Sequence, residues 1–94
     1  MLKQKVKSCD LPESIIQRKV TQKFEAAGWL VVKIIQTTMN GWPDLQCHKD
    51  GVTIFVECKA SGKSPGALQR YRHAQLRDQG FRVLVVYNAD NLFI

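Results

Sequence analysis

Several features that mark common classes of protein are missing from this chain of 94 residues. Its three cysteines are odd in number and form no C-x-x-C pair, which argues against a disulfide framework and a zinc cluster. No apolar run approaches the ~20 residues needed to cross a bilayer, and residues 1–9 lack the apolar stretch of a signal peptide. We therefore expect a protein of the reducing cytoplasm with no membrane partner.

Acidic residues are scarce relative to basic ones. Fourteen lysines and arginines face eight aspartates and glutamates, which gives a formal net charge of +6. Such an excess either keeps a protein soluble or binds an anionic partner, and nucleic acid is the partner that best suits a small basic domain. A 45% hydrophobic content is typical of a globular domain. We assign residues 1–94 to one domain, with a basic lead-in at 1–9 and an apolar tail at 89–94.

Hydrophobic spacing and turn signals predict the order helix, strand, strand, strand, helix, strand. The first helix is expected to open at Asp10, with Glu13 completing a capping box, and to end at Gly28. The second helix is expected over residues 67–79. The expected strands are residues 29–35, 44–49, 52–59 and 81–88. Because the first and last of these are continuous apolar runs, both are predicted to be buried.

The connections between these segments predict the topology of the sheet. Asp50-Gly51 is a strong signal for a hairpin between the second and third strands. Three strands in a meander, followed by a crossover helix and a fourth strand, form a mixed sheet. The sequence therefore predicts an α/β fold with a mixed four-stranded sheet flanked by helices.

The hairpin also predicts a cluster of charged residues at one end of the sheet. Alternate residues of a strand share a face, so Glu57 and Lys59 point the same way, about 6–7 Å apart. Pairing through the turn sets Asp44 opposite Glu57. Neighbouring carboxylates repel unless a cation or a proton lies between them, and their oxygens suit Mg²⁺ or Mn²⁺ better than zinc. With an adjacent lysine to act on water or phosphate, the cluster predicts metal-assisted phosphodiester hydrolysis.

Other interpretations of the same residues stay open. Asp44, Glu57 and Lys59 could form a surface salt bridge at a sheet edge, which is common and contributes little to stability. Glu13 shares the apolar face of the first helix and could reach the same metal, or it could only complete the capping box. His73 follows Gln69 by four residues and could touch phosphate, although a histidine satisfied within the fold is the favoured interpretation.

Taken in order, these motifs resemble a known group of enzymes. The chain has a helical glutamate at Glu13, GWPD at 41–44, VECK at 56–59 and LQRYRHAQLRDQG at 68–80. This set resembles the PD-(D/E)XK nuclease superfamily and, more narrowly, the VRR-NUC (virus-type replication-repair nuclease) family. The resemblance spans nearly the whole chain, and it implies a single restriction-endonuclease-like domain in the order αβββαβ.

The resemblance also implies roles for individual residues. The implied ligands of Mg²⁺ or Mn²⁺ are Asp44, Glu57, the backbone carbonyl of Cys58 and Glu13. Lys59 would act on water or phosphate, and Gln69 would lie near the lysine and the substrate phosphate. Basic residues after the third strand are candidates for phosphate contacts, or equally for solvated charges. These candidates are Lys63, Arg70, Arg72 and Arg77.

The leading functional prediction is a metal-dependent DNA endonuclease, and the alternative is a nucleic-acid-binding module that keeps the fold without cutting. The intact acidic pair argues against the alternative, because a pure binder gains nothing from carboxylates that face phosphates. The phage-type members that the chain resembles imply branched DNA, such as four-way junctions, in a bacterial or phage-infected cell. Because resolving a junction takes two matched cuts, we also predict a homodimer, with the C-terminal strand or tail near its interface.

Overall fold

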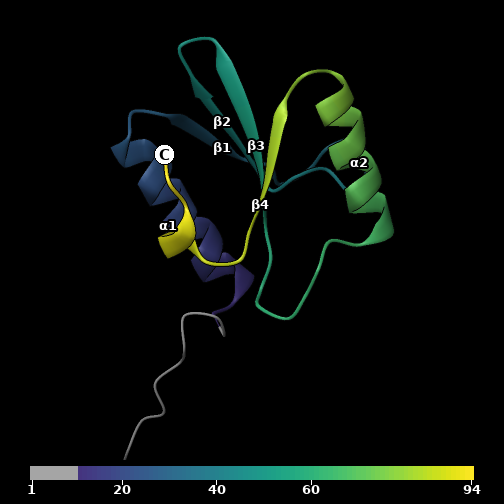
Figure 1. Ribbon diagram of the computed structural model, residues 1–94, viewed down its shortest axis with the longest axis horizontal. Coiled ribbons are helices and arrows are strands. Elements are labelled where there is room, and N and C mark those ends of the chain that lie inside the picture. Colours follow the sequence, from purple (N-terminus) through teal and green to yellow (C-terminus); the bar gives the residue numbers. More distant parts are fainter. Residues whose placement is uncertain (1–10) are drawn as a thin grey trace, which may run out of the picture.

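The computed structural model of the chain describes residues 11–94, and its elements follow the predicted order (Figure 1). They are α1 (Glu13–Ala26), β1 (Leu30–Lys33), β2 (Leu45–Lys49), β3 (Val52–Cys58), α2 (Ala67–Asp78), β4 (Arg82–Val86) and the 3-10 helix η2 (Ala89–Asn91). The strands form one sheet in the order β1-β2-β3-β4, in which only the β3–β4 pair is parallel. Because α1 and α2 lie on opposite faces of this sheet, the predicted α/β fold is confirmed (Figure 1).

The start of α1 differs from the prediction. Pro12 is the N-cap residue, with φ −60° and ψ 152°, and no side chain of the described residues caps the helix. Glu13 is therefore the first helical residue, so the prediction that it completes a capping box is wrong. Proline suits this boundary because its φ is fixed and it has no N–H to leave unpaired. Asp10, the predicted cap, lies outside the described residues.

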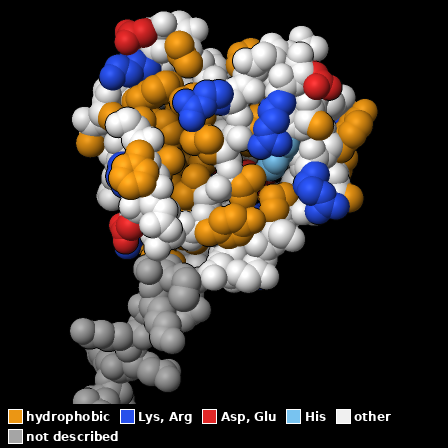
Figure 2. All heavy atoms as spheres, viewed as in Figure 1, with side chains coloured by type: hydrophobic (Ala, Val, Ile, Leu, Met, Phe, Trp, Pro, Cys, Tyr) orange, Lys and Arg blue, Asp and Glu red, His pale blue; other side chains and the backbone are white. Residues whose placement is uncertain are grey.

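Both edges of the sheet are more exposed than continuous apolar runs suggested. β1 spans four residues, and Leu30 and Val32 are 66% and 41% exposed, so the prediction of a buried strand over residues 29–35 is wrong. The run of β-branched residues reflects strand propensity, and within β1 only Val31 packs against the core, as does Trp29 just before the strand. β4 buries Val83 and Val86, but its outer edge is open, and apolar side chains gather around it in Figure 2.

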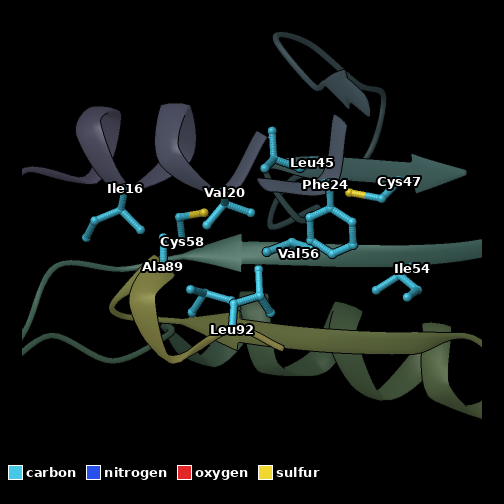
Figure 3. Packing of buried hydrophobic residues seen from close by; sticks show 11 residues of the cluster. Ile16, Val20, Phe24, Leu45, Cys47, Ile54, Val56, Cys58, Ala89 and Leu92 are labelled. Carbon is cyan, nitrogen blue, oxygen red and sulfur yellow. The ribbon is translucent and has the colours of Figure 1, made fainter. Parts of the chain in front are cut away.

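The larger of two apolar clusters lies between α1 and the sheet (Figure 3). α1 contributes three side chains at helical spacing, and they pack on the inner faces of β2 and β3. The buried residues of these three elements are Ile16, Val20, Phe24, Leu45, Cys47, Ile54, Val56 and Cys58. The predicted apolar tail is divided, because Ala89 and Leu92 close this cluster whereas Phe93 is 92% exposed.

The smaller cluster fixes α2 against the opposite face of the sheet. Leu76 of α2 packs with Phe55 of β3 and Val83 of β4. The Phe55 ring makes edge contacts with Trp42 and Phe81, at centroid distances of 5.6 and 5.4 Å. Since Phe55 and Ile54 enter different clusters, the predicted alternation of faces along β3 is confirmed. No helix within residues 11–94 has the length and apolar character that crossing a membrane requires.

Candidate active site

The hairpin register brings Asp44 to the C-terminal end of β3. Leu45 pairs with Val56 across β2 and β3, so the residue before β2 lies opposite Glu57, as the sequence predicted. Asp44 Oδ2 accepts a hydrogen bond of 2.8 Å from the backbone N–H of Cys58. This bond ties the carboxylate of the GWPD loop to the strand that carries the second carboxylate.

Glu57 is a carboxyl group enclosed by protein. The residue is only 1% exposed, although it carries an ionisable group on the central strand pair. Its Oε1 lies 3.3 Å from His73 Nε2, and Gln69 Nε2 donates to its Oε2 at 3.4 Å. Burial first, and then the neighbouring Asp44, raise the pKa of Glu57 from 4.5 to about 8, against an opposing effect of Lys59. This burial contradicts the alternative of an exposed salt bridge at a sheet edge.

Lys59 links the end of β3 to the start of α1. Its backbone N–H donates to the carbonyl of Val86 at 3.0 Å, which extends the pairing with β4 by one residue. Its Nζ lies 3.8 Å from Oε1 of Glu13, and the two side chains are 16% and 39% exposed. The charge of Glu13 also raises the pKa of Glu57, although less than burial and Asp44 do. The structure thus brings the helical glutamate to the cluster, where its contact is with the lysine.

The donor chemistry of the site fits a hard divalent cation. Two carboxyl groups meet here, and Asp44, after burial, raises the pKa of Glu57, so a bound cation would favour the ionised form of Glu57. No group of three histidine, cysteine, aspartate or glutamate side chains within residues 11–94 is arranged to hold a metal. Mg²⁺ is commonly bound by one or two carboxylates together with waters, and Asp44 and Glu57 are donors of this type.

α2 is seated on the loop that carries Asp44. Gly41 has φ +82°, and a Cβ built there would lie 2.9 Å from Cγ of Leu68 and 3.0 Å from its backbone C and O atoms. Arg72 Nε donates to the carbonyl of Asn40 at 2.9 Å, which adds a second link between loop and helix. The glycine of GWPD therefore permits the close approach that carries α2 over the site.

The amide of Gln69 is held from two sides. Its Oε1 accepts the backbone N–H of Gly66 at 2.9 Å, at the N-terminus of α2, while its Nε2 faces Glu57. The structure places Gln69 beside Glu57, whereas the position implied by the resemblance, near the lysine and the substrate phosphate, stays a prediction. The contact between His73 and Glu57 was not predicted, although the spacing of four residues from Gln69 already placed both on one helix face.

The predicted phosphate contacts differ in what they already bind. Arg70, Arg72 and Arg77 each donate to a backbone carbonyl at 2.7–2.9 Å, so they help to link α2 to neighbouring loops and to β4. Lys63, in the loop before α2, is exposed. In Figure 2 basic side chains lie over both halves of the visible face, whereas acidic side chains lie toward its margins.

Comparison with known proteins agrees with the motifs. No family model matches the chain. It is 33% identical over 79 residues to "Putative nuclease p44" of Acyrthosiphon pisum secondary endosymbiont phage 1, covering 83% of this chain and 85% of that protein. It also matches a solved structure described as "VRR_NUC domain" with a TM-score of 0.76 and 34% identity, over 83% of this chain and 86% of that one. The chain belongs to the VRR-NUC family of nucleases.

Proposed function

We propose that this chain is a Mg²⁺- or Mn²⁺-dependent DNA endonuclease that prefers branched DNA such as four-way junctions. The observation that carries the proposal is the carboxyl group of Glu57, which is buried beside Asp44 and has its pKa raised to about 8. Such a pair is costly in a protein core, because at neutral pH the native state must either keep Glu57 protonated or bury its charge beside Asp44. Perturbed carboxyl groups of this kind gather at catalytic sites.

Asp44, Glu57 and the backbone carbonyl of Cys58 would hold the ion in this proposal. When bound, it would supply a Lewis acid for the scissile phosphate and lower the pKa of a water molecule. Lys59 Nζ would stabilise negative charge on a phosphate oxygen or orient the attacking water. Glu13, at 3.8 Å, would keep the ammonium group near this position, and this pairing supports a role for Glu13 that involves the lysine.

The charge of the chain supports a polyanionic substrate. A net charge of +6 on 94 residues favours binding to phosphates, with release of counterions. Lys63 is exposed in the loop between β3 and α2, and we propose it as a phosphate contact. The phage origin of the similar nuclease supports action inside a bacterial or phage-infected cell, in the cytoplasm where the DNA lies.

Two matched cuts across a junction require two sites, so we propose a homodimer. The open edge of β4 supports this assembly, because it borders a hollow of about 330 Å³ lined by residues 83–88, Asn91 and Leu92. Two aromatic residues that follow β4 in the sequence are also exposed: Tyr87 is 39% exposed and Phe93 is 92% exposed. Light scattering coupled to size exclusion tests the assembly, because a mass of 10.7 kDa at micromolar concentration would refute it.

One gel experiment tests the catalytic proposal. Junction, flap, duplex and single-stranded DNA are incubated with the protein in Mg²⁺, Mn²⁺ or EDTA. We expect cleavage in either metal, fastest on the junction, and none in EDTA. Asp44→Ala should abolish cleavage while DNA binding persists. The matched control is Asp78→Ala, at an exposed position at the end of α2, and it should cut normally.

Each alternative gives a different pattern in this gel. Binding without cleavage under every metal condition would favour the non-catalytic module. Full activity of Asp44→Ala would refute the assignment of the site. Equal rates on all four DNA substrates would leave a nuclease but refute the preference for branched DNA.

A further inference from the structure

A buried histidine faces the acidic pair from α2. His73 is 2% exposed, and its Nε2 lies 3.3 Å from Oε1 of Glu57, which is itself 1% exposed. A buried carboxylate requires hydrogen-bond donors for its oxygens, because water cannot reach them. Gln69 supplies one donor, to Oε2. The ring of His73 meets the other oxygen, so the two side chains of α2 share the carboxylate between them.

A metal ligand must be ionised, and an ionised Glu57 sets the tautomer of this histidine. An ionised Glu57 can only accept hydrogen bonds, so the facing nitrogen must carry a proton. Burial, and then the charge of Arg77, lower the pKa of His73 below its usual 6.5, so the ring donates while it is neutral. With Glu57 ionised, the contact is then a hydrogen bond donated by the Nε2–H of His73.

The surroundings of His73 keep the ring in place. Leu76, one turn further along α2, is buried against Phe55 and Val83. At the other end of the helix, the close approach of Gly41 to Leu68 fixes α2 on the GWPD loop. A donor carried by so fixed a helix can select one orientation of a glutamate, whose side chain otherwise has several rotamers.

We propose that His73 is a positioning residue, whose Nε2–H holds Oε1 of Glu57 so that the carboxylate stays turned toward the metal site it shares with Asp44. The inference rests on the proposed metal-dependent function. His73 acts through Glu57 and touches neither the substrate nor the ion. Hydrogen-bond partners of metal ligands typically change metal affinity or activity by about 10–100-fold when they are removed.

The tautomer can be observed directly without metal or DNA. The chain has two histidines, so a long-range ¹H–¹⁵N spectrum of the rings holds two sets of signals. His48 is the internal reference, with Nδ1 2.9 Å from Thr53 Oγ1. We expect the His73 signals to show the Nε2–H form in EDTA at about pH 9.5, where Glu57, with its pKa raised to about 8, is ionised. A ring protonated only at Nδ1 would overturn the proposal, because that tautomer cannot donate to Glu57.

Binding of Mn²⁺, measured by calorimetry without DNA, tests the consequence for the site. His73→Leu removes the donor while keeping an apolar side chain, and we expect its Mn²⁺ affinity to fall at least about tenfold. His73→Gln places an amide donor near the original Nε2. It should therefore lose less Mn²⁺ affinity than His73→Asn, whose shorter side chain cannot bring its amide within reach of Glu57. His48→Leu is the matched control and should bind Mn²⁺ like the wild type.

The outcomes separate this inference from the proposed function. Wild-type affinity in both His73→Leu and His73→Asn would overturn the positioning role and leave the metal site intact. A wild-type protein that binds no Mn²⁺ would overturn the proposed function and, with it, the effect of His73 on the metal. If urea titrations show that His73→Leu does not fold, the Mn²⁺ affinities of His73→Gln and His73→Asn decide the question. Equal affinities of these two variants would refute the positioning role of His73.

Discussion

Replacing Gly41 by alanine tests whether the close contact between α2 and the GWPD loop holds the site together. Gly41 has φ +82°, and an added Cβ would lie 2.9–3.0 Å from atoms of Leu68 that include its backbone C and O. Backbone atoms within a helix cannot move aside as a flexible side chain can. Alanine at this position should therefore push α2 away from the loop, together with Gln69 and His73.

The expected loss of stability has two parts, and a second glycine separates them. An alanine forced to a positive φ costs roughly 1–2 kcal/mol, and overpacking typically adds about 1–3 kcal/mol. Gly62 has the same φ of +82°, but a Cβ there would meet nothing within 4 Å. Gly62→Ala should thus show only the backbone part, and the difference between the two variants measures the contact with Leu68.

Urea unfolding in EDTA, followed by far-UV circular dichroism, gives the free energies of unfolding. We expect Gly41→Ala to be less stable than Gly62→Ala by about 1–3 kcal/mol. Its Mn²⁺ affinity should also fall, whereas that of Gly62→Ala should match the wild type. Equal destabilisation by the two substitutions, with unchanged Mn²⁺ affinity, would refute the view that this contact seats α2 over the acidic pair.

Three further predictions concern charge. Burial raises the pKa of Glu57 from 4.5 to about 8, so the contribution of Glu57 to the stability of the metal-free protein should be largest below about pH 4.5, where Glu57 is protonated in both the folded and the unfolded state. The free energy of unfolding should then fall as the pH rises through 8, by on the order of a few kcal/mol in total. Urea titrations in EDTA at pH 5, 7 and 9 should show this decline, and its persistence in Glu57→Gln would contradict the assignment. Lys59→Ala should lower turnover far more than Mn²⁺ affinity, since an ammonium group is no ligand; calorimetry that showed lost binding with normal turnover would disprove its role. Lys63→Ala should flatten the slope of log K against log salt for DNA by about one unit, and an unchanged slope would place the contact elsewhere.

The pairing of the two carboxylates could be predicted because it depends on local rules. Asp50 and Gly51 have φ of 51° and 78°, the backbone that a two-residue hairpin turn requires and that this dipeptide favours. Once the turn is fixed, the register follows by counting, and Asp44 must lie opposite Glu57. The strand order follows equally from short connections and one crossover.

The environment of that pair depends on tertiary packing and was beyond local rules. α2 buries only His73 and Leu76, so its sequence gives a weak apolar pattern and does not reveal which face meets the sheet. That face is set by the approach of Gly41 to Leu68, between residues that are distant in sequence. The exposure of β1 could not be predicted for a similar reason. A run of β-branched residues indicates strand propensity, but it does not indicate which element covers the strand.

The position of Glu57 on β3 serves the proposed function at a cost in stability. β3 lies between β2 and β4 and is covered on both faces, so an ionised Glu57 there opposes folding. At the edge strand β1 the same carboxyl group would be hydrated, and its pKa would not be raised by burial. On β3 the carboxylate is reached from both helical layers, by Gln69 and His73 of α2 on one side and by the charge of Glu13 of α1 on the other. The hydrogen-bond donors that orient Glu57 therefore exist only where its charge is costly, and a cation bound there would stabilise the whole domain together with its site.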